Sequence, residues 1–229
     1  MAAHRSPKRP AADGGPGPDS GPDRGPDRHA ALALYRRRAP VYDLELALFE
    51  PLRAEAIARL APRPGDTVLD VACGTGLSFA GLRRAVGPRG RVIGLEQSPE
   101  MVAQARRRIA RARWRNVDLL CAPAEAAPLS GQADAALFHL SHDVLQHADA
   151  VAHLMRHLKP GAPVVACGLK WAGGLMRPAN LLVWVAARHS VTDFASLGAP
   201  WRLLAPHLDG LTVGDRWLGA VYLAHGRRR

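Results

Sequence analysis

The sequence predicts an α/β protein whose core is a doubly wound, mostly parallel sheet of seven strands that ends in an antiparallel hairpin. Two features support this fold class. After Pro64 and Gly65, short β-rich runs alternate with longer amphipathic stretches, as in parallel strands joined by crossover helices. The last two β-rich runs are separated by too few residues for a crossover helix, so we expect them to pair antiparallel.

The expected elements follow in chain order. Strands are predicted at 67–71, 91–95, 117–121, 135–140, 163–168, 211–217 and 220–224. Helices are predicted at 77–86, 99–113 and 149–158, with one or two more within 32–60. In that last stretch apolar residues recur at helical spacing around a break at Pro40. A chain of 229 residues, 48% of them hydrophobic, can build one sizeable core without a metal or a disulfide.

The composition divides the chain into a tail and one domain. Residues 1–30 are rich in Pro, Gly, Asp and Arg and nearly lack apolar side chains, so we predict a disordered tail there. Residues 31–229 are expected to form a single domain. Within it, the stretch from about 171 to 206 has no regular pattern and carries Trp171 and Trp201 among Gly and Pro. We interpret this stretch as an insertion that covers the sheet as a lid.

The cysteines indicate the cellular compartment, and the net charge indicates the kind of partner. Three cysteines without CxxC pairing predict reduced thiols and a cytoplasmic location. No apolar run reaches the roughly 18 residues of a spanning helix. The net charge of +11 suits an acidic partner such as an anionic membrane surface, with peripheral contact only. Arginine scattered over a solvated surface explains the same net charge. The charge alone therefore does not show that the protein has an acidic partner.

A glycine turn follows the first predicted strand, and ligands of open α/β sheets bind at that end of the strands. The run Asp70-Val-Ala-Cys-Gly-Thr-Gly76 leads directly into a helix. A dinucleotide fingerprint needs a third glycine where Phe79 stands, which disfavours NAD and FAD. The Gly-Lys-Ser/Thr ending of a phosphate-binding P-loop is absent as well.

These residues resemble motif I of class I S-adenosylmethionine-dependent methyltransferases, an acidic residue followed by three alternating small positions. Asp70, Ala72, Gly74 and Gly76 occupy those positions, with Ala72 in place of the usual first glycine. The resemblance is closest to the type 11 group, which includes the ubiquinone-biosynthesis-like and bacterial phospholipid N-methyltransferase-like enzymes. It implies a Rossmann-like methyltransferase fold and S-adenosyl-L-methionine as cofactor.

The resemblance also implies further cofactor contacts after the next two strands. Glu96 stands where the family has the acidic residue for the ribose hydroxyls, next to Gln97, and Met101 is expected to be an apolar wall for the adenine. After the third strand, Ala124 and Glu125 match part of the family's Gly-Asp-Ala-Glu segment. Pro123 replaces its Asp, so the adenine must be recognised by other groups. Tyr42 resembles a tyrosine placed over the cofactor, and a core aromatic explains it equally well.

Candidates for catalysis and acceptor binding follow the fourth and fifth strands. His139, His142 and Asp143 form a candidate general base with its orienting carboxylate, although His142 and Asp143 are also explained as caps of the next turn. Lys170, Trp171 and Trp201 are candidates for the acceptor site, because an aromatic ring attracts a cationic methylated nitrogen. A hydrophobic wall is the other explanation for the tryptophans. No metal site is expected.

We therefore expect a methyltransferase that acts on a small molecule or a lipid headgroup. A nucleic-acid-associated methyltransferase or binding protein is one alternative. It is disfavoured because the fourth strand is followed by His-Leu-Ser-His rather than by the Asn/Asp-Pro-Pro-Tyr motif of many nucleobase methyltransferases. A catalytically silent protein with the same fold is the other alternative, supported only by Ala72 and Pro123.

Overall fold

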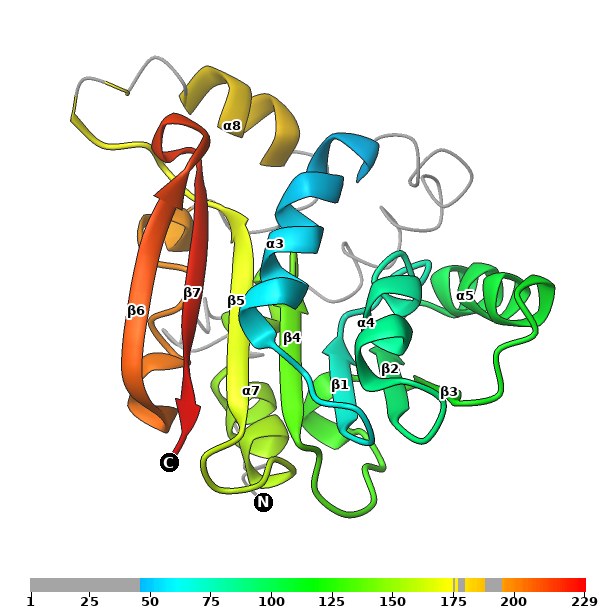
Figure 1. Cartoon of the computed structure of the whole chain (residues 1–229). Helices are drawn as coiled ribbons and strands as arrows, with labels where there is room; N and C mark the ends of the chain where they lie inside the picture. The colour runs from blue at the N-terminus through cyan, green and yellow to red at the C-terminus, as the bar shows by residue number, and fades with distance from the viewer. Residues whose placement is uncertain (1–45, 175, 177–179, 188–194) are drawn as a thin grey trace, which may run out of the picture.

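The computed structural model describes residues 46–174, 176, 180–187 and 195–229 (Figure 1). The predicted tail, Tyr42 and the first part of the predicted 32–60 helical stretch lie outside the described residues. So do 175, 177–179 and 188–194 within the predicted insertion.

A seven-stranded sheet with the order β3-β2-β1-β4-β5-β7-β6 forms the centre of the molecule. Strands β1 to β5 run parallel, and β7 pairs antiparallel with both β5 and β6. The strands are β1 Thr67–Val71, β2 Arg91–Glu96, β3 Val117–Cys121, β4 Ala135–His139, β5 Pro163–Leu169, β6 Leu208–Arg216 and β7 Val221–Arg228. The predicted fold class is confirmed.

Strand boundaries differ from the prediction mainly at the C-terminal hairpin. β6 begins three residues before the predicted start and β7 runs four residues beyond the predicted end, although polar residues and glycine interrupt both runs. Antiparallel pairing across these positions, with an irregular register between Asp209 and Thr212, extends the hairpin. β4 ends at His139 rather than 140 because Leu140 adopts a positive φ of 56°, which a strand does not allow.

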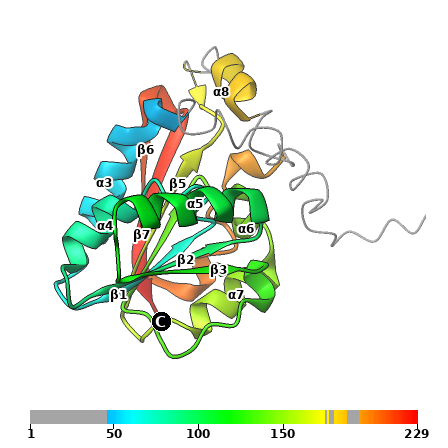
Figure 2. The same cartoon turned by 90° about the vertical axis from the view of Figure 1, so that its right-hand side faces the viewer.

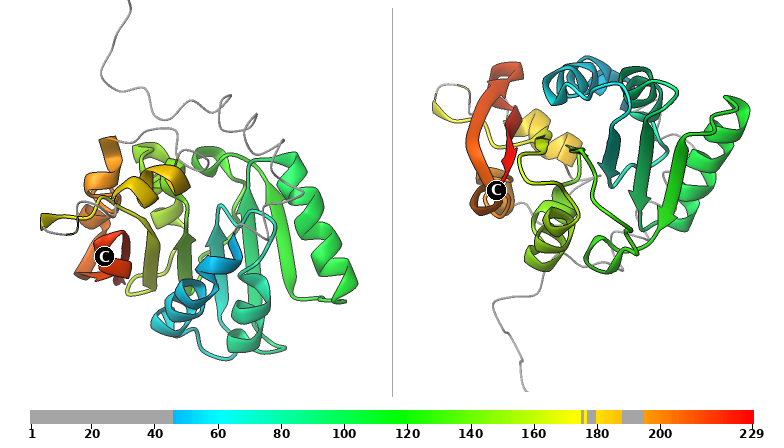
Figure 3. Two further views of the ribbon diagram at one scale, coloured as in Figure 1. Left: turned by 90° about the horizontal axis from the view of Figure 1, so that it is seen from above. Right: turned by 60° about the horizontal axis from the view of Figure 1, so that its bottom comes forward.

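Helices cover both faces of the sheet (Figures 2 and 3). One face carries α3 Glu50–Leu60, α4 Phe79–Val86 and α5 Pro99–Arg111, and the other carries α6 His142–Leu145 and α7 Ala148–Arg156. A further helix, α8 Asn180–Ala187, lies beyond the carboxyl ends of the strands. Short 3-10 turns are η1 Leu46–Phe49, η2 Ala124–Ala126, η4 Ala195–Gly198, η5 Ala205–His207 and η6 Trp217–Gly219.

Two apolar cores result from this layering, because the central strands bury side chains on both faces. Leu69 and Phe138 point into the core under α6 and α7. Val68 and Leu137, their neighbours in sequence, point into the core under α3 and α4. This alternation explains why the strands read as continuous apolar runs in the sequence.

Phe79 connects α4 to the sheet through two glycines. Its buried ring begins α4 and occupies space that only residues without a Cβ leave open. A Cβ added at Gly94 of β2 would lie 2.5 Å from the Phe79 ring and 2.9 Å from the Cys73 sulfur. A Cβ at Gly76 would lie 2.4 Å from the same ring.

We therefore expect Gly94→Ala to destabilise the protein by about 1–3 kcal/mol, the usual range for overpacking a core. Urea unfolding should measure this loss. Gly173→Ala is the matched control, since an added Cβ there meets nothing within 4 Å, and it should change the free energy of unfolding by less than about 0.5 kcal/mol. Equal stability of both variants would contradict the tight packing of Phe79.

Candidate functional site

The carboxyl ends of β1, β2 and β4 form the edge where a ligand is expected. The chain leaves β1 toward β2 and β3 on one side and returns to β4 and β5 on the other, so β1 and β4 flank the switch point of the sheet. Ligands of doubly wound sheets bind in the crevice outside this point.

The turn after β1 adopts a backbone that suits small residues. Ala72, Gly74 and Gly76 all have positive φ angles, of 52°, 56° and 79°. The amide of Cys73 donates to the carbonyl of Leu95 on β2, and the amide of Gly76 donates to the Cys73 carbonyl. Ala72 thus takes a left-handed conformation that glycine adopts without strain, which explains why the related motif favours glycine there.

Glu96 joins this turn to the turn after β2. One of its carboxylate oxygens accepts from the Gly74 amide at 3.1 Å, and the other accepts from the Ser98 amide at 2.8 Å. Burial raises the pKa of Glu96, while hydrogen bonds from the backbone of Ser98, Gly74 and Gln97 lower it. A carboxylate offers about four acceptor positions, so these three donors leave capacity for a ligand hydroxyl.

Asp70 is buried at the end of β1, and its Oδ2 atom has no hydrogen-bond partner. Burial raises its pKa to about 7, although the nearby Arg53 guanidinium lowers it. Arg53 lies on α3 with 2% exposure, and its side chain pairs with Glu50. An unsatisfied buried carboxyl next to a buried guanidinium is expected where a polar ligand completes the site.

Sequence reasoning missed Arg53. Its signal was its spacing: Arg53, Ala56 and Leu60 recur at three and four residues, which places them on the buried side of α3. An arginine on such a stripe is unusual, because a buried guanidinium needs a charged partner.

His142 lies across the end of β5 rather than open to a ligand. Its Nε2 accepts from the amide of Leu169 at 3.0 Å, and Gly168 leaves space for the ring, since a Cβ there would lie 2.8 Å from Nε2. Burial lowers the pKa of His142 to about 4. A neutral ring whose Nε2 already accepts a hydrogen bond is poorly placed to take a substrate proton, so this geometry argues against His142 as the base.

The other base candidates differ in their surroundings. Burial, assisted by Arg53, lowers the pKa of His139 to about 3, so this ring is neutral near pH 7. Asp143 is close enough for its charge to raise the pKa of Glu96, which places it toward the turn after β2. Ser141, which precedes α6, makes no side-chain capping bond.

The remaining predicted cofactor residues lie near the ends of β2 and β3. Met101 is buried in the first turn of α5, where the Ser98 hydroxyl accepts from its amide. Ala124 and Glu125 form η2 directly after β3, with Ala124 buried and Glu125 partly exposed. These residues lie at the carboxyl edge of the sheet, on the side of β2 and β3.

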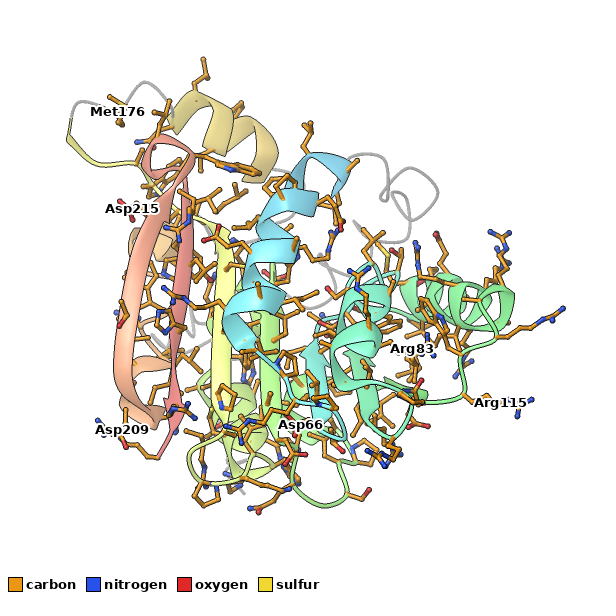
Figure 4. All side chains as sticks on the ribbon, in the orientation of Figure 1. Asp66, Arg83, Arg115, Met176, Asp209 and Asp215 are labelled. Atoms are coloured by element: carbon orange, nitrogen blue, oxygen red, sulfur yellow. The ribbon has the colours of Figure 1, made fainter. Side chains whose placement is uncertain are left out.

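The two tryptophans among the acceptor candidates pack into cores on opposite faces of the sheet. Trp171 packs against the core under α3 and α4, whereas Trp201 packs against Tyr222 in the core of the opposite face, with ring centroids 5.1 Å apart. The ammonium of Lys170 pairs with Asp215 on β6 at 3.1 Å (Figure 4 labels Asp215). The two core positions agree with the hydrophobic-wall explanation of the tryptophans. No group of three His, Cys, Asp or Glu side chains is arranged for a metal ion within the described ranges.

Comparison with known proteins decides the family. A methyltransferase domain family matches residues 68–161, from β1 to the turn after α7. The 2-phytyl-1,4-naphtoquinone methyltransferase of Synechocystis sp. is 30% identical over 201 residues, which cover 80% of this chain and 81% of that protein. The chain belongs to the class I S-adenosylmethionine-dependent methyltransferases. The predicted resemblance and cofactor are confirmed.

Other relatives agree with this methyltransferase family. The demethylmenaquinone methyltransferase of Lactococcus lactis is 31% identical over 115 residues, 49% of this chain and 46% of that protein. Among solved structures, N-methyltransferase NodS from Bradyrhizobium japonicum in complex with S-adenosyl-L-homocysteine has a TM-score of 0.62 at 17% identity, covering 86% of this chain and 97% of that one. The chain thus spans from about half to four fifths of the curated relatives named here.

The carboxyl edge of this methyltransferase fits S-adenosylmethionine. The turn at 72–76 leaves room for a close approach, Glu96 keeps acceptor capacity for hydroxyls, and Asp70 has a buried oxygen without a partner. A positively charged ligand with a diol satisfies such groups.

Asp70 predicts a specific pH dependence of stability. The unfolded chain releases the Asp70 proton near pH 3.8, whereas the folded protein holds it until about pH 7, so this group's stabilising contribution is lost as pH rises through that range. Asp70→Asn removes the effect. We expect the variant to match the wild type near pH 4 and to gain about 1–4 kcal/mol in free energy of unfolding at pH 8, in the absence of cofactor.

Urea unfolding at pH 4 and pH 8 tests this expectation. The exposed Asp209→Asn is the control, and its difference from wild type should stay small at both pH values. His139 and His142 act oppositely, because their lowered pKa values remove stability as pH falls below 6.5, but this term cancels in the comparison. A loss of stability in Asp70→Asn at pH 8 would show that its ionised form is stabilising.

Proposed function

We propose that this protein transfers a methyl group from S-adenosylmethionine to a small, largely apolar acceptor or to a lipid headgroup. The observation that supports this proposal is the Glu96 and Asp70 arrangement at the switch point, together with relatives named for naphthoquinone and demethylmenaquinone methylation. Those names do not favour the nucleic-acid alternative. Methyl transfer by the purified protein would exclude the alternative of a catalytically silent protein with the same fold.

We propose that the cofactor is held by the residues predicted from the motifs. Ala72, Gly74 and Gly76 form the close turn, and Glu96 with Gln97 meets the ribose side. Met101, Ala124 and Glu125 line the adenine side, while Asp70 and its neighbour Arg53 lie below the turn.

The bound cofactor supplies an electrophilic methyl group on a sulfonium. The protein's residues then contribute orientation and exclusion of water, which favour a transfer that disperses positive charge. Neutral His139 and His142 add no positive charge near that centre at pH 7, because burial keeps both pKa values low. Asp143, whose charge raises the pKa of Glu96, is the remaining base candidate predicted near the site.

The insertion from about 171 to 206 is proposed to act as a lid over this edge. Its described part includes α8, which lies beyond the carboxyl ends of the strands (Figure 1). The side chain of Asn180 at the start of α8 makes two hydrogen bonds with the backbone of Ala172, so the helix is anchored next to the end of β5.

We also propose that the enzyme is located in the cytoplasm, with peripheral membrane contact.

Methyl transfer from labelled S-adenosylmethionine tests the function directly. The purified protein is offered a hydroxylated naphthoquinol with a prenyl tail, phosphatidylethanolamine vesicles, a soluble tricarboxylic acid and total RNA. We expect label in the organic phase, from the first or second acceptor. Label only in the acid or in RNA would overturn the proposal, as would intact cofactor binding with no transfer to any of them.

Glu96 provides a test of the cofactor site. Glu96→Gln keeps the side-chain shape but replaces one acceptor oxygen by a donor that faces backbone amides. We expect the dissociation constant for S-adenosylmethionine to rise about 10- to 100-fold, or about 1.4–2.8 kcal/mol, by calorimetry. The exposed Asp209→Asn should leave the affinity unchanged. An unaltered affinity in Glu96→Gln would exclude Glu96 from the site.

A further inference from the structure

The large apolar side chains that are exposed in the described part of the chain gather at one end of the molecule. We call them the apolar rim: Leu48, Met176, Leu181, Trp184, Trp217 and Leu218, exposed by 78%, 41%, 68%, 48%, 44% and 71%. They come from η1, from α8 and the segment before it, and from η6. In Figure 1, α8 and the starts of α3 and β7 lie at the same end of the molecule, and Met176 is labelled near α8 in Figure 4.

Contacts link the three segments of the rim. The rings of Phe49 in η1 and Trp217 in η6 have centroids 5.2 Å apart. Gly219 of η6 lies against Ala172, since an added Cβ would be 3.7 Å from the Ala172 side chain. Ala172 in turn holds the Asn180 side chain at the start of α8. The segments that carry the rim are therefore linked to one another by direct contacts.

The turn between β6 and β7 exposes two of these side chains at a cost in strain. Trp217, Leu218 and Gly219 have consecutive positive φ angles of 47°, 57° and 82°. Bulky residues avoid this region, and Asn or Gly would occupy it more easily. Backbone strain that presents apolar side chains to water is characteristic of functional surfaces.

Charge around the rim favours contact with a lipid surface. Among the described residues close to the rim, three acidic side chains are each paired with a cation: Glu50 with Arg53, Glu55 with Arg216, and Asp215 with Lys170. These carboxylates thus present no uncompensated negative charge, and the whole chain carries +11. Two indoles among leucines match the composition that settles at a membrane interface.

We propose that the apolar rim docks on the surface of a lipid bilayer. This inference rests on the proposed function, because an apolar acceptor partitions into the membrane and the rim borders the edge where it would be methylated. No helix among the described residues has the length and apolar character to cross a membrane. We expect the rim to bury its apolar side chains in the interface of one leaflet.

Vesicle cosedimentation with full-length protein tests the proposal. We expect binding to neutral phosphatidylcholine vesicles that persists at high salt. The double variant Leu181→Ser/Leu218→Asn should raise the lipid concentration for half-maximal binding at least tenfold, because two exposed leucines no longer insert. Leu218→Asn alone should weaken binding while its melting temperature stays equal or rises by about 2 °C, since Asn tolerates the left-handed turn.

A matched control separates docking from charge attraction. Arg107→Glu/Arg111→Glu changes exposed arginines of α5, away from the rim, and should weaken binding only to anionic phosphatidylglycerol vesicles at low salt. Calorimetry should find the S-adenosylmethionine affinity of all variants unchanged. Membrane binding without methylation of any apolar acceptor or lipid headgroup would overturn the proposed function and leave the docking inference standing.

Three outcomes would overturn the docking proposal. One is absence of binding to neutral vesicles. A second is binding that the arginine variant abolishes and the rim variant does not. The third is a wild-type dimer in sedimentation velocity that becomes monomeric in Leu181→Ser/Leu218→Asn, which would assign the rim to a second copy of the chain. Methylation of a water-soluble form of the acceptor in any of these cases would leave the proposed function intact.

Discussion

The buried Glu96 carboxylate connects the parts of the site that must stay in register. Its two oxygens accept from the amides of Gly74 and Ser98, so the turns after β1 and β2 are fixed to each other. Phe79 supports the same arrangement from the side of α4, because its ring fills the space left by Gly76 and Gly94. Because Glu96 is buried, these two hydrogen bonds are sheltered from competition by water. Removing either the carboxylate or the glycines would therefore loosen one turn relative to the other.

The same edge concentrates groups that do not stabilise the fold. Asp70, His139 and Tyr222 each keep a buried polar atom without a partner, and Ala72 and Leu140 hold left-handed backbone at the ends of β1 and β4. Each feature is costly in a core and common where a ligand completes the hydrogen bonding. The stability of this protein is thus expected to be lowest in the region that binds the cofactor. The loss of unfolding free energy expected as pH rises toward the Asp70 pKa of about 7 is one instance.

Most of the fold could be predicted because its signals are local. The alternation of apolar runs located β1 to β5, and the helix predicted from residue 99 begins there as α5, where the Ser98 hydroxyl accepts from the Met101 amide. The site was less predictable because its geometry depends on contacts between distant segments. His142 looked like a base in sequence, yet the Leu169 amide, 27 positions later, occupies its Nε2. Arg53 was not among the predicted site residues, yet α3 places it close enough to Asp70 for its charge to lower the pKa of that carboxyl.

Charge and apolar surface are separated in this molecule. Between residues 83 and 118 the chain has ten arginines against three acidic residues, so most of the net charge of +11 belongs to α4, α5 and the strands beside them. Three of these arginines, Arg107, Arg108 and Arg111, line one groove with Trp114, whose ring faces the Arg83 guanidinium. Only Arg108 reaches the cofactor turn, where its Nε donates to the Thr75 carbonyl at 2.9 Å. Long-range attraction to an anionic surface therefore acts mainly through the α5 side and is screened by salt, whereas burial of the apolar rim depends little on salt.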